Sequence, residues 1–445
     1  MKKRIVSIVC LLAMLLSMTT MGAFSASAAT VGSVEFIDVA PVENLDYSFA
    51  ILGDIQTVNT YEVKHQNTYK SLTNMFTWLV KNQESRKIEY VLGLGDTVDT
   101  LYTYPESYNP IYYNRVEWEK ARTCFKKLNG VIPYMVVRGN HDDEIGYNKY
   151  IATTEYQNQI IKDANGNEVG GFYYDPNKTA TKGNSMSNCY RKLEIGNHKY
   201  LMLGLDYAIG AANDGNDVVE WASGVIAANP DYKVIISLHT YLSTSGEYMQ
   251  GLQVESSNGD RTATEPISFY GRKLWNMFKT HSNIFMIFSG HVSVDDPVVS
   301  YHTGEQGNQI INILVDPQST YEFDPADPNG KATLPLPLVL MMNVTNGGKA
   351  LEFEYICTDK NKQLKAKNRF TIELPEGTLP EYISADSEVV TEAPTTEAAT
   401  TTEAPVTTEA SKKNNCKNSI TSTVAVCCTM GTALAAFAMR KRKED

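Results

Sequence analysis

The stretch YMVVRGNHD, at residues 134–142, decides the fold class. Its first four residues, 134–137, form a short apolar run, which predicts a buried strand. The polar group GNHD, at residues 139–142, follows almost at once. An apolar strand that runs directly into glycine, asparagine and histidine has few purely structural reasons to exist. The stretch therefore predicts a functional loop at the end of a buried strand.

Two similar units precede this stretch. The apolar run at residues 47–52 ends in Gly53-Asp54, and the run at residues 88–94 ends in Gly95-Asp96. Apolar residues recur with helical spacing at positions 72, 75, 76, 79 and 80 between them, and again over residues 118–128. This βαβαβ order predicts an α/β fold. Open α/β sheets bind ligands at the carboxyl ends of their strands, so the polar groups are expected to converge there.

The later half of the chain repeats this alternation. His239 and His291 each follow an apolar strand-like run. Three further strand-like runs have short connections, which predicts a second sheet that is more antiparallel. The predicted strands are 200–205, 234–238, 284–288, 309–315, 336–344 and 351–357, and the predicted helices are 218–227 and 274–278.

The polar residues that follow the strands have the chemistry of metal ligands. A single histidine after a strand is more often structural than a ligand, but here five polar groups occur in order. They centre on Asp54, Asp96, Asn140, His239 and His291. Carboxylates, imidazoles and an amide oxygen together suit divalent ions such as Mn, Fe, Zn or Co. Two such ions, about 3.5–4 Å apart, can hold a phosphate ester for in-line attack.

The five groups resemble the calcineurin-like metallophosphoesterase superfamily, whose pattern is D-x-H, G-D-x-x-D, G-N-H-D/E, a single histidine and G-H-x-H. The resemblance covers residues 46 to about 320. It implies a two-sheet β-sandwich flanked by helices. It also implies that Asp54 binds a first metal, that Asp96 bridges two metals, and that the second metal has three further ligands, Asn140, His239 and His291.

The same resemblance implies an acid beside the metals. His141 would face the phosphate and protonate the leaving alcohol, and Asp142 would orient the His141 ring. Asp99 would support the metal ligands from outside, as metal sites commonly require. These roles predict an enzyme that hydrolyses phosphate esters with a metal-activated water.

Two departures from the family pattern concern the first metal. Gln56 stands where the family has the histidine of D-x-H, and Ser293 stands where it has the second histidine of G-H-x-H. An amide oxygen and a hydroxyl are weaker donors than imidazole. We therefore expect two divalent ions, Mn, Fe or Zn, with a first site that is weak, empty or filled by a harder ion such as Mn or Mg. Alternatively, Asp295 or Asp296 replaces the missing ligand.

Longer stretches, at residues 188–206 and 307–318, resemble a secreted bacterial branch of this superfamily with a D-x-Q first motif. Within them, Asp206 and Gln318 either line the site or cap buried strand ends. Arg138 and Arg191 are the nearest candidates for a phosphate contact.

The two ends of the chain predict its location. Residues 1–29 have the basic start, apolar run and small-residue cleavage site of a secretory signal peptide. Residues 30–375 form the expected phosphoesterase domain, and the Thr/Glu/Ala/Pro-rich residues 376–419 predict a disordered stalk. Residues 420–439 are uncharged and long enough to cross a bilayer, and the basic tail 440–445 predicts a cytoplasmic C-terminus. We expect a single-pass protein of a bacterial cell membrane with an extracellular catalytic domain.

Charge and motifs together narrow the partners. The net charge of −11 argues against a nucleic-acid polymer, which needs clustered basic residues. We expect a monomer that acts on a phosphorylated small molecule or an envelope polymer. The alternative is a metal-containing binding module at the cell surface that has lost catalysis. The pair His141 and Asp142 favours the enzyme, because a purely structural metal does not require it.

Overall fold

The computed structural model describes residues 30–31, 34–65, 68–99, 110–174, 184–207, 216–249, 270–329, 331–364 and 369–385. All of them belong to one compact unit, Met1–Glu388, and the second unit, Val389–Asp445, lies outside the described residues. The predicted signal peptide, most of the predicted stalk, the predicted membrane segment and the basic tail also lie outside them. None of the helices that the structure describes has both the length and the apolar character needed to cross a membrane.

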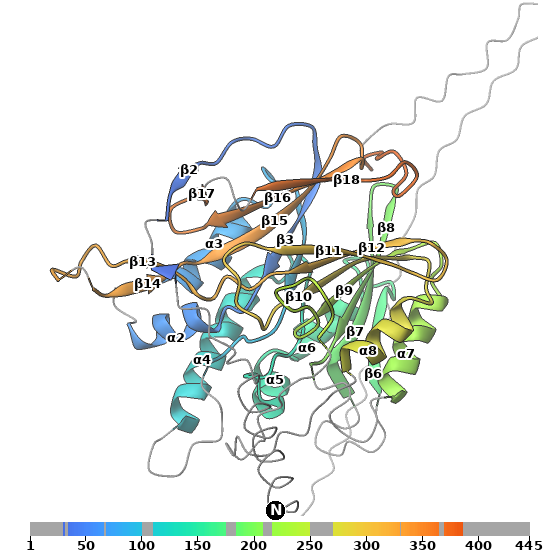
Figure 1. The fold of residues 1–445 in the computed structure, drawn as a ribbon. Coiled ribbons are helices and arrows are strands. Elements are labelled where there is room, and N and C mark those ends of the chain that lie inside the picture. Colours follow the sequence, from blue (N-terminus) through green and yellow to red (C-terminus); the bar gives the residue numbers. More distant parts are fainter. Residues whose placement is uncertain are drawn as a thin grey trace, which may run out of the picture. The chain divides into compact units, whose positions relative to one another are not determined.

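Two mixed β-sheets form the body of the described unit (Figure 1). The eight-stranded sheet has the order β2-β17-β16-β15-β3-β4-β5, with β18 paired to β16. Its strands are β2 (Phe36–Asp38), β3 (Leu45–Leu52), β4 (Ile88–Gly93), β5 (Tyr134–Val136), β15 (Leu338–Thr345), β16 (Ala350–Cys357), β17 (Lys362–Leu364) and β18 (Phe370–Glu373).

The seven-stranded sheet has the order β11-β12-β10-β9-β8-β7-β6, and a small third sheet has the order β1-β13-β14. The strands of the seven-stranded sheet are β6 (Gly170–Tyr174), β7 (Asn184–Ile195), β8 (His198–Leu205), β9 (Lys233–Leu238), β10 (Ile284–Ser289), β11 (Val298–Thr303) and β12 (Gln309–Leu314). The small sheet consists of β1 (Thr30–Val31), β13 (Thr320–Phe323) and β14 (Thr333–Pro335).

Alternating side chains of β8 show how the layers pack. Tyr200 faces the other sheet, where its ring lies 5.5 Å from that of Phe49 on β3. Leu201 and Leu203 point the opposite way, into a core cluster that includes residues of α7 and α8. Figure 1 shows these two helices beside the seven-stranded sheet, with α2 and α4 near the other sheet. The helices are α2 (Gln56–Lys64), α3 (Ser71–Lys81), α4 (Pro110–Phe125), α5 (Glu144–Tyr150), α6 (Thr154–Ile161), α7 (Asn216–Ala227), α8 (Tyr270–Phe278) and the 3₁₀ turn η1 (Lys126–Leu128).

The strand and helix positions match the predictions closely, but the predicted division into sheets was wrong. The run 309–315 forms β12, which pairs in parallel with β10. The runs 336–344 and 351–357 form β15 and β16, which return to the first sheet and pair antiparallel beside β3. Short connections explain the antiparallel pairing of β15 with β16, but they do not determine which sheet edge the pair joins.

The body continues past residue 375, where we placed the boundary with the stalk. The side chain of Asn197 donates to the Glu381 carbonyl and accepts from the Ile383 amide, each at 2.8 Å. His198 Nε2 lies 2.8 Å from the Pro380 carbonyl. The segment up to residue 385 is therefore attached to the seven-stranded sheet.

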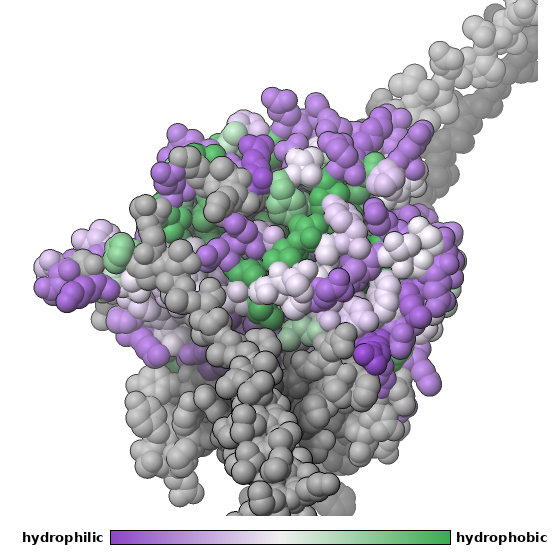
Figure 2. Space-filling model, viewed as in Figure 1, coloured by the Kyte–Doolittle hydropathy of each residue, from purple (hydrophilic) through white to green (hydrophobic). Residues whose placement is uncertain are grey.

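Viewed from the same side as Figure 1, polar residues cover most of the described surface, with a patch of apolar residues near its centre (Figure 2).

Candidate metal centre

The five predicted ligands lie in loops at the carboxyl ends of five strands. Asp54, Asp96 and Asn140 follow β3, β4 and β5, which run parallel to one another. His239 and His291 follow β9 and β10, which are parallel neighbours in the other sheet. The carboxyl ends of parallel strands share one edge, so each sheet presents its polar residues together. The structure brings these residues into one centre between the two sheets.

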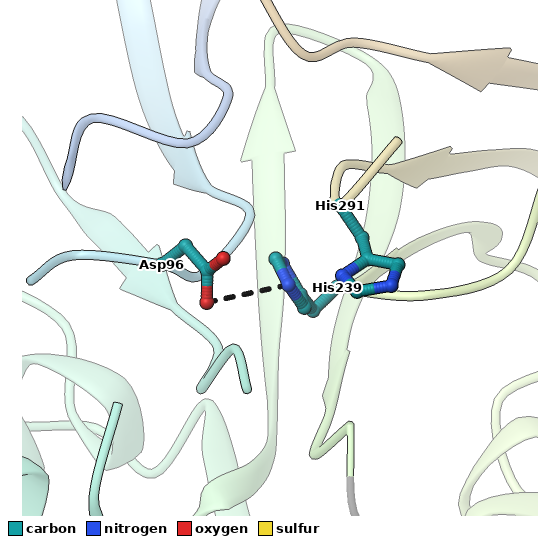
Figure 3. A group of neighbouring side chains, drawn as sticks. All are labelled: Asp96, His239 and His291. Carbon is teal, nitrogen blue, oxygen red and sulfur yellow. Dashed lines mark ion pairs between the residues drawn. The ribbon is translucent and has the colours of Figure 1, made fainter. Parts of the chain in front are cut away.

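Asp96, His239 and His291 form a cluster that can hold a metal ion. One ligand atom from each lies within 4.8 Å of the others. His239 Nε2 lies 3.3 Å from Asp96 Oδ1, and His291 approaches from the next loop (Figure 3). Asn140 completes the group, because its Oδ1 atom lies 2.8 Å from both His239 Nε2 and His291 Nδ1. The side chains that the resemblance assigned to the second metal therefore lie close together.

The hydrogen bonds of His239 fix the direction of its lone pair. Its Nδ1 atom lies 2.9 Å from the Leu94 carbonyl, which can only accept, so Nδ1 carries a proton. The Nε2 lone pair of the neutral ring then faces Asp96 Oδ1 and Asn140 Oδ1, which are also acceptors. Such a convergence of acceptors is stable only with positive charge between them, either a divalent ion or a second proton on His239. The residues present fit a divalent ion.

The pKa values of the two histidines show how burial and neighbouring charges affect their protonation. Burial opposes a charge on His239, but the neighbouring Asp96 carboxylate outweighs burial and raises the pKa of His239. Burial, together with the nearby His239, lowers the pKa of His291 to about 4. His291 is therefore neutral near pH 7 and has a lone pair to offer a metal.

Two glycines let the ligands approach one another. A Cβ atom at Gly139 would lie 2.2 Å from Asp96 Oδ1, and one at Gly290 would lie 2.2 Å from Asp54 Oδ1. Three of the predicted ligands also adopt the left-handed backbone region that L-residues rarely use: Asp54 at φ +36°, Asp96 at φ +46° and His291 at φ +72°. Backbone strain of this kind, about 1–3 kcal/mol at each residue, typically persists at functional sites.

The surroundings of the first metal position contain mainly oxygen atoms. Asp54 Oδ2 accepts the His291 amide at 3.0 Å, while the buried Oδ1 atom has no hydrogen-bond partner. Burial, followed by the charges of Asp316 and Asp96, raises the pKa of Asp54 well above its usual range. An unpartnered carboxylate oxygen with no solvent exposure is costly, so this position also fits a cation.

The two departures, Gln56 and Ser293, both contact the loop after β12. The Gln56 amide lies 2.7 Å from the Gln318 side chain, and Ser293 Oγ donates to Ser319 Oγ at 2.6 Å. Asp295, which we considered as a replacement ligand, is exposed to solvent. Asp296, the other candidate, is half-buried. A residue that was not among the predicted ligands, Asp316, is fully buried and interacts with Asp54.

His141 lies at the edge of the cluster, and Asp99 holds its ring. Its backbone amide donates to Asp96 Oδ1 at 2.9 Å, and Nδ1 lies 2.9 Å from the Asp99 carbonyl. Burial lowers the pKa of His141, but the charges of Asp96 and Asp99 and the bond to the Asp99 carbonyl outweigh burial and raise it. The side chain keeps 27% of its surface exposed, so it can reach a substrate.

The Asp142 carboxylate, which we predicted to orient the His141 ring, is bonded to backbone amides. It accepts the backbone amides of Thr97, Val98 and Gly139 at 2.8, 3.1 and 3.0 Å. It therefore ties the loop after β5 to the loop after β4, and Asp99 takes the task of orienting His141. The family resemblance implied the direct pairing, but the turn at residues 139–142 directs the carboxylate toward the neighbouring loop.

Arg138, a predicted phosphate contact, ties the loop after β5 to the residue that follows β8. Its guanidinium forms two hydrogen bonds of 3.1 Å with the Asp206 carboxylate and one of 3.3 Å with the Asp142 carbonyl. Both partners of the ion pair are buried. Arg191, the other candidate, donates to the carbonyls of Gln159 and Lys162. Both arginines therefore hold backbone segments of this chain.

Comparison with known proteins shows the family of this chain. The calcineurin-like phosphoesterase family matches residues 47–295, which is more than half of the chain. The chain belongs to this family.

Among solved structures, a purple acid phosphatase from yellow lupin (Lupinus luteus) seeds is similar, with a TM-score of 0.40 and 14% identity over 74% of this chain and 53% of that one. The chain thus spans about half the length of the lupin protein. GAP50, described as the anchor in the inner membrane complex of Plasmodium, has a TM-score of 0.38 and 10% identity over 76% of this chain and 92% of its own. A search of curated proteins by sequence finds no match.

Proposed function

We propose that this chain is a metal-dependent phosphoester hydrolase whose general acid is His141. One observation supports this function most directly. The lone pair of His239 Nε2 faces two further acceptors, Asp96 Oδ1 and Asn140 Oδ1, and His141 lies beside them with its own Nδ1 already bonded. A metal-ligand cluster next to a partly exposed imidazole is the arrangement that assisted hydrolysis of a phosphate ester needs.

The chain's own residues would carry the proton transfer. Divalent ions held by this centre would supply hydroxide near neutral pH and neutralise the charge of the phosphate oxygens. Because the Asp99 carbonyl holds His141 Nδ1, the Nε2 atom is left to give a proton to the leaving oxygen as the P–O bond breaks. The alcohol departs neutral, the oxygen of water stays on phosphorus, and solvent returns a proton to His141.

The raised pKa of His141 supports the role of an acid. A ring with a pKa above the usual histidine value is protonated in a larger fraction of molecules at neutral pH. Asp99 carries this effect twice, through its backbone carbonyl and through its carboxylate, whose Oδ1 atom lies 3.9 Å from His141 Nδ1.

The proposed site of action is the outer face of a bacterial membrane. The signal-peptide pattern of residues 1–29, the stalk composition of residues 376–419 and the apolar run at residues 420–439 support this location. Scavenged nucleotides, sugar phosphates or phosphorylated envelope polymers would be the substrates within reach there. The departures at Gln56 and Ser293 favour the second candidate, a surface binding module without catalysis.

Hydrolysis assays separate the two candidates. Aryl phosphate monoesters and diesters are incubated with the chelator-treated protein, with Mn²⁺, with Zn²⁺ or with no metal. We expect metal-dependent turnover by the wild-type protein, its loss in Asp96→Ala, and a loss in His141→Ala that is larger for esters with poorer leaving groups. Turnover by the wild type no higher than that of these variants, across a broad ester panel, would leave only the binding module.

A further inference from the structure

The loop after β12 contacts both positions at which the family's histidines are missing. Gln318 binds the Gln56 amide, and the next residue, Ser319, binds the Ser293 hydroxyl. The two departures follow strands of different sheets, since Gln56 begins α2 after β3 and Ser293 follows β10. A single loop that reaches both is well placed to provide what the two lost histidines provided.

Asp316 begins this loop and lies against Asp54. The two carboxyl groups are within hydrogen-bonding reach of each other, and both are almost completely buried. Gln318 holds Asp316 in place, because its backbone amide donates to Oδ1 at 3.1 Å and its side-chain amide donates to Oδ2 at 2.9 Å. Two buried carboxylates in contact repel each other unless a proton or a cation lies between them.

Asp54 Oδ1 independently indicates a cation. It is a fully buried carboxylate oxygen without a hydrogen-bond partner. It lies 3.8 Å from His239 Nδ1, but the N–H of Nδ1 already donates a hydrogen bond to the Leu94 carbonyl. The Gln56 amide lies beside the same position, where its nitrogen can donate to Asp96 Oδ2 at 3.3 Å and to the Val98 carbonyl at 3.2 Å.

We propose that the first metal position is an oxygen-only site for a hard divalent cation such as Mg²⁺ or Mn²⁺, with Asp316 as a ligand beside Asp54 and Asp96. Carboxylate and carbonyl oxygens suit Mg²⁺ and Mn²⁺, whereas imidazole suits Zn²⁺ and Fe. The second position, with His239 and His291, keeps the imidazole ligands. The chain is therefore a mixed-metal protein, and this inference rests on the proposed function only in taking Asp96 as the shared ligand.

Manganese binding tests the proposal without any measurement of turnover. The full chain is freed of metal with a chelator, loaded with one equivalent of Zn²⁺ and titrated with Mn²⁺, and the free ion is counted by electron paramagnetic resonance. We expect one Mn²⁺ per chain in addition to the Zn²⁺. Pulsed measurements on the bound Mn²⁺ should lack the ¹⁴N coupling of a directly bound imidazole. A strong imidazole coupling, or the absence of a bound Mn²⁺, would overturn the proposal.

Substitutions assign the site to Asp316. Asp316→Asn should weaken Mn²⁺ binding by at least about tenfold, while Zn²⁺ remains at one per chain. Loss of a residue that only supports a metal ligand already costs about tenfold or more in affinity, and loss of a ligand itself should cost no less. The retained Zn²⁺ and an unchanged circular dichroism spectrum report that the variant is folded. Asp54→Asn changes the opposite carboxylate and should give the same loss of Mn²⁺ binding. If Asp316→Asn does not fold, the Mn²⁺ affinity of Asp54→Asn tests whether the cation lies between these two carboxyl groups.

Asp295→Asn is the matched control. It removes a carboxylate from the loop after β10, where a replacement ligand was also conceivable, and it should leave both ions bound as in the wild type. Loss of Mn²⁺ in Asp295→Asn but not in Asp316→Asn would refute the assignment. The result is independent of catalysis: a chain that binds Mn²⁺ through Asp316 but hydrolyses nothing would contradict only the proposed function, and an active chain without this Mn²⁺ would contradict only the present inference.

Discussion

Replacing Gly139 with alanine should disable the metal centre by adding a single methyl group. The added Cβ atom would lie 2.2 Å from Asp96 Oδ1 and 2.3 Å from the Asp96 backbone nitrogen. Non-bonded heavy atoms reach a favourable separation only near about 3.5 Å, so Asp96 and the loop after β5 must move apart by about 1 Å. Rotation of the Asp96 side chain cannot relieve the contact with its backbone.

The cost follows from that displacement. A misplacement of about 1 Å in a group that positions the reacting atoms can lower a rate on the order of 100-fold, which corresponds to about 2.7 kcal/mol in the activation barrier. Metal binding should weaken as well, because Asp96 also contacts His239. Turnover of an aryl phosphate and Zn²⁺ binding by calorimetry measure the two effects in the same preparation.

A second glycine provides the control. Gly224 lies in α7, is exposed, and has no atom within 4 Å of an added Cβ. Gly224→Ala should stabilise the fold by about 0.5–1 kcal/mol and leave turnover unchanged. If Gly139→Ala bound Zn²⁺ and turned over substrate as the wild type does, Asp96 would not occupy the position described for it, and the reasoning would be refuted.

Three further predictions concern other residues. His141→Ala should lower turnover by about 10²–10⁴-fold for alkyl phosphates and much less for aryl phosphates with acidic leaving groups, and equal losses across a leaving-group series would exclude an acid role. Asp142→Asn should lower the free energy of unfolding in urea by about 1–3 kcal/mol, because an amide nitrogen would face the Gly139 amide that Asp142 Oδ2 now accepts, and an unchanged midpoint would contradict this. His198 has a pKa lowered by burial from the usual 6.5, so below that pH the unfolded chain takes up a proton that the folded chain does not. Stability should therefore fall as the pH drops from about 7.5 to about 5, and His198→Gln should reduce this fall; equal slopes in both proteins would argue against it.

The order of strands and helices could be predicted because each element buries one face. In α3, Leu72, Phe76 and Leu79 are fully buried, at the spacing that the sequence shows. The sheet partners could not be predicted in the same way. Leu340 of β15 pairs with Ile51 of β3, almost 300 residues earlier, and no local pattern indicates which sheet edge is open.

The site was predictable where a polar residue directly follows an apolar strand. That signal indicates Asp54, Asp96, Asn140, His239 and His291, which the structure brings together. The same signal was present at Asp316, just after the run 309–315, but the family pattern gave no reason to interpret it. The task of Asp142 was out of reach for a different reason, because its partners are backbone amides that every sequence contains.

The second metal position joins the two sheets, and the departures at the first position preserve that connection. Asp96 and Asn140 come from the eight-stranded sheet, whereas His239 and His291 come from the seven-stranded one. In the family pattern, a histidine at position 56 would help to join the two sheets through the first metal, and this chain lacks that histidine. Gln56 restores such a link as a hydrogen bond to Gln318, and the contact between the Asp54 and Asp316 carboxyl groups adds a second crossing. These contacts tie the same two loops that a cation would tie. We therefore expect the substitutions to change which ion the first position prefers without loosening the loops that would hold the second ion.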